Sequence, residues 1–193
     1  MRIQQAPIQQ DTDINIELPP KEPDEDAAGF VSMPDMYQHG FNLFRAHVEL
    51  SQIQGHIYDA LVSVRSQQRS SGERATSCQA IRLLIKDWKG RIPATLSAEA
   101  LSQTQNYLPC IPKYLCMLYG TVVTCLGQLC QVNSMDFRWV DQLRHYGRSI
   151  TVALGETSLP PPQPQGWNAL VNACREFMPL FISVQDKGPA FIW

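Results

Sequence analysis

Apolar residues recur at helical spacing along most of this chain, and no alternation of apolar and polar residues persists over five residues. A spacing of three and four places side chains on one face of an α-helix, whereas a strand needs a spacing of two. No turn dipeptide joins two apolar runs, as a β-hairpin would require. The pattern therefore predicts an all-α fold, an irregular bundle or array of about five to seven helices.

The first apolar stripe predicts a long amphipathic helix of about seven turns between Tyr37 and Val64. Pro34 precedes it, and the drift of the stripe indicates a helix that wraps a core or bends slightly near Gly55. A Ser/Gln/Gly-rich stretch follows, which we interpret as a solvated loop carrying Arg65, Arg69 and Arg74. The stripe itself comprises Tyr37, Phe41, Phe44, Val48, Leu50, Ile53, Ile57, Leu61 and Val64.

Two further helices are predicted in the middle of the chain. One spans about 76–89, with Gly90 and Pro93 as stop signals and an inner face of Ile81, Leu84, Ile85 and Trp88. The other begins with Pro112 in its first turn and runs to about Val132. Between them, Ser97 to Tyr107 is a short helix or a loop. We expect one core cluster of Trp88, Leu84, Ile53, Ile57, Tyr114 and Leu118.

Two more helices flank a proline-rich linker at 155–166. Ser134 is a candidate N-cap of the first, with Asp136 in its first turn and an inner face of Val140, Leu143, Gly147, Ile150 and Leu154. The second carries the stripe Trp167, Leu170, Val171, Cys174, Phe177, Met178 and Phe181. Pro179 is expected to kink it, and Gly188-Pro189 to end it before the terminal Phe191-Ile192-Trp193.

Residues 1–35 differ from the rest in being polar, acidic and rich in proline. Such a composition predicts an extended arm that lies over a folded body. The expected organisation is therefore an acidic arm at 1–35 followed by a helical domain at 36–193. The acidic residues of the arm are Asp11, Asp13, Glu17, Glu22, Asp24, Glu25 and Asp26.

No catalytic, cofactor-binding or metal-ligating residues are identified, and no cofactor is expected. The sequence has no HExxH, P-loop or GxSxG motif, and the clustered carboxylates of the arm are solvated. His47 and His56 are nine residues apart, which places them on opposite sides of one predicted helix; the other two histidines are His39 and His145. The six cysteines lack zinc spacing and are interpreted as buried free thiols: Cys78, Cys110, Cys116, Cys125, Cys130 and Cys174. The chain is thus predicted not to be an enzyme.

Charge and hydropathy bear on nucleic acids and membranes. The net charge is -2, which argues against binding of phosphate backbones through bulk charge. The N-terminus has no apolar core of a signal peptide, so we expect a protein that is not secreted. Residues 114–130 are apolar enough to suggest a membrane anchor, but a helix buried on all sides explains them as well. We expect no membrane attachment.

The order of these motifs resembles the middle homology region of fungal-specific transcription factors, the regulatory domain that follows a binuclear zinc cluster. The similar residues of the acidic segment are Asp11, Asp13, Ile14, Glu17, Leu18 and Pro19. Those of the long helix are Val48, Leu50, Ile53, Gly55, Ile57, Tyr58, Asp59, Leu61, Ser63 and Arg65. Leu84, Trp88 and Pro93, then Tyr114 and Leu118, then Cys174-Arg175-Glu176 continue the series.

The resemblance implies nuclear residence, with the cytoplasm as an alternative, and control of transcription through protein or small-effector contacts. Its implied partners are the transcription machinery or a second copy. DNA binding and zinc are implied for the family only, because the six-cysteine cluster is missing here and Gln128-Leu129-Cys130 replace the Arg-Pro pair of the family. The family domain continues into further helices, so we expect this one to be incomplete at its C-terminus. An all-α small-molecule-binding protein or enzyme is the alternative.

Overall fold

The computed structural model describes residues 17–21, 30–31, 41–103, 110–134, 137–152 and 161–184. It confirms the predicted all-α class. The helices are α1 (Leu43–Ile57), α2 (Val64–Gln67), α3 (Ser71–Arg91), α4 (Ala98–Gln103), α5 (Cys110–Ser134), α6 (Phe137–Val152) and α7 (Trp167–Ser183), with a 3₁₀ turn at Ala94–Leu96. Two residues of β1 (Phe30–Val31) pair antiparallel with two of β2 (Phe41–Asn42).

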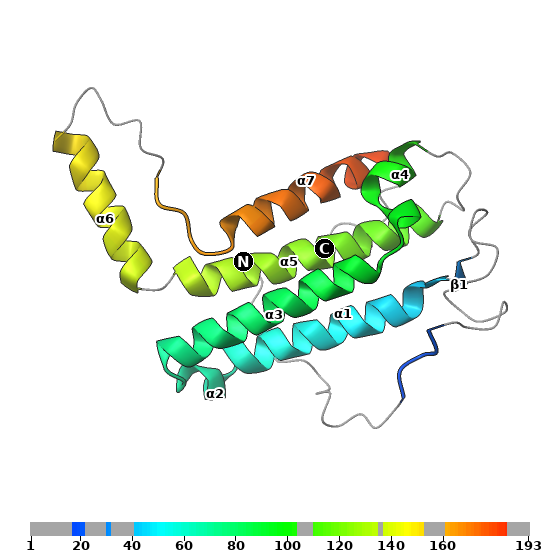
Figure 1. Ribbon diagram of the computed structural model, residues 1–193, viewed down its shortest axis with the longest axis horizontal. Helices are drawn as coiled ribbons and strands as arrows, with labels where there is room; N and C mark the ends of the chain where they lie inside the picture. The colour runs from blue at the N-terminus through cyan, green and yellow to red at the C-terminus, as the bar shows by residue number, and fades with distance from the viewer. Residues whose placement is uncertain are drawn as a thin grey trace.

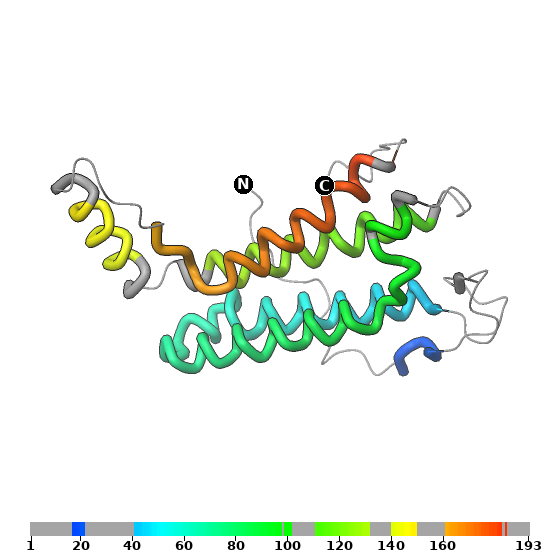
Figure 2. The backbone as a smooth tube through the Cα atoms, turned by 45° about the horizontal axis from the view of Figure 1, so that its top comes forward, coloured from blue at the N-terminus to red at the C-terminus, as the bar shows by residue number. Residues whose placement is uncertain are grey.

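Four long helices build the body of the molecule (Figure 1). Helices α1 and α3 lie side by side, α5 packs against both of them, and α7 covers α5 from the other side. Helix α6 projects away from this bundle beyond the end of α5, as Figure 2 shows from a second angle. None of the described helices is long and apolar enough to cross a membrane.

The core is one cluster between α1, α3 and α5, to which α7 adds its inner face. Of the six residues expected there, Ile53, Ile57, Trp88 and Leu118 are buried and Tyr114 packs at the edge. The prediction that Leu84 is a core residue is wrong, because 42% of its surface is exposed. The buried stripe of α3 follows Cys78, Ile81, Ile85 and Trp88, and Leu84 lies at the rim of this stripe.

The single helix predicted for 37–64 is shorter and interrupted. Asn42 caps α1 by accepting a hydrogen bond from the Arg45 backbone N–H, so Phe41 precedes the helix. A π-helical turn at Tyr58–Val62 follows Ile57, and Ser63 then caps α2. The new start and the π turn shift the stripe, which leaves Phe44 and Val64 exposed. Residues 37–40 lie outside the described part.

The prediction of a solvated loop before the second helix is partly wrong, because α3 already begins at Ser71. Ser70 and Glu73 form a capping box: the Ser70 hydroxyl accepts from the Glu73 backbone N–H, and the Glu73 carboxylate accepts from the Ser70 N–H at 2.8 Å. These bonds satisfy backbone donors that a helix start leaves open. Arg74 therefore lies in the first turn of α3, whereas Arg65 lies in α2.

In the second half of the chain, the ends and exposed faces of the helices differ from the prediction. Helix α5 runs through Ser134, so this serine ends α5 instead of capping the next helix; Asp136 and Leu154 lie outside the described residues. On α6, Leu143 and Gly147 are exposed because the helix stands away from the bundle. Helix α7 contains Pro179 and ends at Ser183, before the stop predicted at Gly188-Pro189. The segments Gly188-Pro189 and Phe191-Ile192-Trp193 are outside the described part.

Candidate interaction site

Polar side chains converge on the first turns of α1, where residues 17–21 of the predicted arm meet the helical bundle. Asn42 is buried, and its Nδ2 donates to the Pro20 carbonyl oxygen at 3.0 Å. Its Oδ1 accepts from the Arg45 backbone N–H at 2.9 Å. One side chain thus caps the helix and binds the arm, which uses both hydrogen-bonding ends of the amide.

Arg45 makes the second contact to the arm. Its Nη1 donates to the carbonyl oxygen of Pro19, while its Nε donates to Glu49 Oε1 at 2.8 Å. Glu49 Oε2 pairs with Arg91 Nη2 of α3 at 3.0 Å. The carboxylate is thus shared by two guanidinium groups and is largely shielded from solvent. Such charge-assisted bonds have fixed geometry, so this network orients Arg45 toward the arm.

The same turns of α1 are fixed from two other sides. The indole Nε1 of Trp88 donates to the Ala46 carbonyl oxygen at 2.8 Å, in a fully buried contact between α3 and α1. On the α5 side, His47 Nδ1 and the Tyr114 hydroxyl lie 2.9 Å apart, with their rings in an edge arrangement. Burial lowers the pKa of His47 and raises the pKa of Tyr114, which favours the neutral form of both.

Asn42 and Arg45 bind backbone groups of the arm and not its side chains. Both arm acceptors are backbone carbonyl oxygens of Pro19 and Pro20, whose rings fix φ. Leu18 and Pro19 are half-buried at this contact. We name the set Asn42, Arg45, Glu49 and Arg91 the arm clamp. Its chemistry suits binding of an extended proline-containing segment, because donors meet carbonyl groups that proline positions in advance.

A second set of contacts ties the linker and α7 to the bundle. Arg82 of α3 donates to the Gln165 carbonyl oxygen at 2.9 Å, and the Cys130 thiol of α5 approaches the same oxygen at 3.9 Å. Gly166 then adopts a φ of 89°, which a side chain would strain, and the Arg82 guanidinium packs directly against it. Lys89 of α3 pairs with Glu176 of α7 at 2.5 Å. The start of α7 is therefore fixed against α3 and α5.

The cysteines and histidines are distributed over several elements. Cys78, Cys116, Cys125 and Cys130 are buried free thiols, and Cys174 is half-buried. Burial raises the pKa of Cys125 to about 12, which disfavours the reactive thiolate. Among the described residues, no three His, Cys, Asp or Glu side chains are grouped so as to hold a metal ion. His56 and His145 are exposed, and His39 lies outside those residues.

The surface also has a depression at the start of α3 with a volume of about 550 Å³. Its lining is Arg69, Gly72, Glu73, Thr76 and Ser77. Ligand pockets for small molecules are enclosed and mostly apolar, with few polar groups. This depression is polar and shallow, unlike such a pocket.

Sequence reasoning missed the arm clamp, although part of its signal was present. Arg45 and Glu49 have the i, i+4 spacing of a helical ion pair. Arg91 is 42 positions further along the chain than Glu49, and nothing in the local pattern links the two. The family resemblance marks the Leu18-Pro19 pair but indicates no binding partner for it.

The sequence is similar to two curated fungal proteins. Each is named an ABC-transporter-regulating transcription factor, one from Aspergillus fumigatus and one from Aspergillus oryzae. Both are 27% identical to this chain over 146 residues, which is 76% of this chain and 16% of the relative. The chain thus spans a small part of the length of these relatives. No protein-family profile matches it. No solved structure matches it either.

Proposed function

We propose that this chain is a regulatory domain, or part of one, that controls transcription through contacts with other proteins or a small effector. The observation that carries the proposal is the similarity to two fungal transcription regulators over 76% of the chain. The motif order that resembles the middle homology region of fungal-specific transcription factors supports it, as does the all-α fold. On this proposal the protein acts in the nucleus, and DNA is bound by a segment outside these residues.

The arm clamp gives this proposal a physical site. The proposal takes residues 1–35 as the arm and residues 36–193 as the helical domain, with a linker at 155–166. Pro19 and Pro20 are hydrogen-bonded to Asn42 and Arg45 at the start of α1. A partner that binds and displaces the arm would therefore break these bonds to the bundle. Glu49 and Arg91 extend that connection to α3. The clamp is therefore one point at which the arm and the helical domain are coupled, beside the pairing of β1 with β2.

Tethering the chain to a reporter promoter tests the function. The full chain is fused to an unrelated DNA-binding module, and reporter transcription is compared with that of the module alone. We expect a change in transcription that Trp88→Ala abolishes, since this substitution removes a fully buried core side chain. The matched control, Leu83→Ala, alters an exposed residue of the same helix and should retain the effect. Transcription equal to that of the module alone would contradict the proposal.

A further inference from the structure

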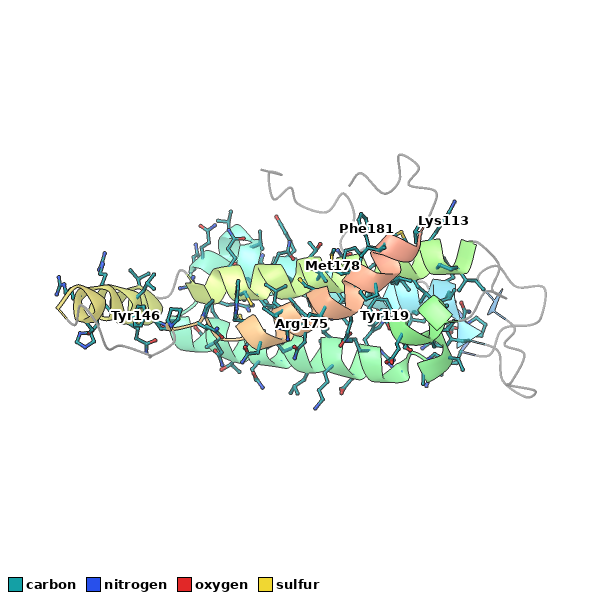
Figure 3. All side chains as sticks on the ribbon, turned by 90° about the horizontal axis from the view of Figure 1, so that it is seen from above. Lys113, Tyr119, Tyr146, Arg175, Met178 and Phe181 are labelled. Carbon is teal, nitrogen blue, oxygen red and sulfur yellow. The ribbon has the colours of Figure 1, made fainter. Side chains whose placement is uncertain are left out.

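Helix α7 packs one apolar face on the bundle and leaves a second apolar face partly exposed. Its inner face presents Ala173 and Leu180 to the core, with Phe177 packed so close to α5 that a side chain at Gly120 would touch it at 3.4 Å. Its outer seam follows Trp167, Val171, Cys174 and Met178 at spacings of four, three and four. Figure 3 shows α7 as the outermost helix over α5, with Met178 and Phe181 labelled on it.

The outer seam leaves large apolar side chains in solvent. Met178 is 48% exposed and Ile182, next to the seam, is 69% exposed. Val171 and Cys174 are half-buried, and Trp167 at the start is exposed. A continuous apolar stripe of this kind along a whole helix marks a surface that another element covers. The spacing is that of a seam between two packed helices.

Helix α6 carries a matching seam. Val140, Leu143 and Gly147 follow at spacings of three and four, and Leu143 is 39% exposed. A side chain built at Gly147 would meet nothing within 4 Å, so no neighbour in this arrangement requires a glycine there. Glycine inside a helix is destabilising relative to alanine. A glycine in an apolar seam fits the close approach of a second helix.

The lengths and connections of the two helices fit each other. Helix α6 has 16 residues and α7 has 17, so both are about 25 Å long. Helix α6 follows two residues after α5, and the contact of Cys130 with Gln165 places the end of α5 beside the start of α7. From Val152 to Pro161 the chain takes nine residue steps, which reach about 30 Å. This connection is long enough for α6 to lie along α7.

The direction of the pairing follows from the topology. Helices α5 and α7 run antiparallel (Figure 1), so α6 folded back from the end of α5 would run parallel to α7. Arg144 and Arg175 each follow a seam residue directly, after Leu143 and Cys174. In a parallel helix pair, Arg144 and Arg175 would lie on opposite sides of the interface. In an antiparallel pair they would lie on the same side. The parallel arrangement therefore avoids a repulsive contact between the two arginines.

We propose that the outer seam of α7 is a docking surface whose occupant is α6 of the same chain. The structure then shows an open arrangement, and closure would pack Leu143 against Cys174 and Gly147 against Met178. Tethering within one chain favours this occupant over a second copy, because it gives a high effective concentration. The inference is independent of the proposed transcriptional role.

A disulfide experiment tests this, because Cys174 is already present at the predicted contact. Leu143→Cys in the full chain is treated with diamide, which accepts the two hydrogens lost when two thiols join. We expect an intramolecular disulfide between positions 143 and 174, identified by peptide mapping of the monomer. Its formation should be about tenfold or more faster than for His145→Cys, the control on the opposite side of α6. Adding Cys174→Ser to Leu143→Cys should abolish it.

Two results would overturn the proposal. Disulfide-linked dimers through positions 143 and 174 would identify a second copy as the occupant. Equal rates for Leu143→Cys and His145→Cys would show that α6 does not dock on this seam. Both substitutions alter exposed residues, so each variant is expected to fold like the parent chain.

Discussion

Trp88 provides the strongest test of the core, because it packs between α3 and α1 and also donates a hydrogen bond. Its side chain is 1% exposed, and its Nε1 bonds to the Ala46 carbonyl oxygen at 2.8 Å. Trp88→Ala should lower the free energy of unfolding by about 3–5 kcal/mol, since it removes a large buried side chain and leaves a cavity. Trp88→Phe keeps much of the apolar contact and loses the hydrogen bond, so a loss of about 1–2 kcal/mol is expected.

The assay is equilibrium unfolding in urea for each variant. Unfolding is monitored by the helical circular dichroism signal at about 222 nm. Leu83→Ala serves as the control, because Leu83 lies on the exposed side of the same helix and should cost under about 0.5 kcal/mol. A loss under about 0.5 kcal/mol for Trp88→Ala would show that Trp88 is not a core residue. A Trp88→Phe loss as large as that of Trp88→Ala would assign the effect to the hydrogen bond alone.

Three further predictions concern the cap, the clamp and the histidine. Ser70→Ala should lower the free energy of unfolding by about 1 kcal/mol, because it removes the N-cap of α3, and an unchanged urea midpoint would argue against that cap. Glu49→Ala should cost about 1–3 kcal/mol by leaving Arg45 and Arg91 without their shared carboxylate, and the loss should exceed that of the exposed Asp59→Ala. Burial lowers the pKa of His47 below its ordinary value of 6.5, so the stability from neutral His47 is present above that value and lost as the pH falls through the folded-state pKa. Urea unfolding at pH 7.5 and about 5 should therefore show a smaller pH effect for His47→Gln, and an identical pH effect in both proteins would contradict this.

Periodicity in the sequence was sufficient to predict the helices, but less so their ends and faces. Most residues of the predicted stripes between Leu50 and Leu61 and between Ile81 and Trp88 are buried, because an amphipathic helix on a core has one inner side. The start of α3 was missed although Ser70 and Glu73 have capping-box spacing. The π turn at Tyr58–Val62 has no such local signal.

The exposed faces of α6 and α7 show that the apolar pattern of a helix does not determine which element packs against it. Both helices carry apolar stripes, and the sequence pattern assigns the stripe of α6 to the interior. In the structure Leu143 of α6 and Met178 of α7 are exposed, since an apolar stripe indicates that a helix is covered but not which element covers it. The arm clamp depends similarly on contacts between distant segments, as with Glu49 and Arg91.

The most direct test of the account is whether the arm clamp controls transcription by the tethered chain. Reporter output is measured for Arg45→Ala, which removes the bond to the Pro19 carbonyl, and for Arg65→Ala, which alters an exposed arginine of α2. Both variants are first shown by urea unfolding to be folded. The account predicts that Arg45→Ala changes the output and that Arg65→Ala leaves it at the parent level. Equal output from the parent chain and both variants would contradict a coupling of the arm to the helical domain.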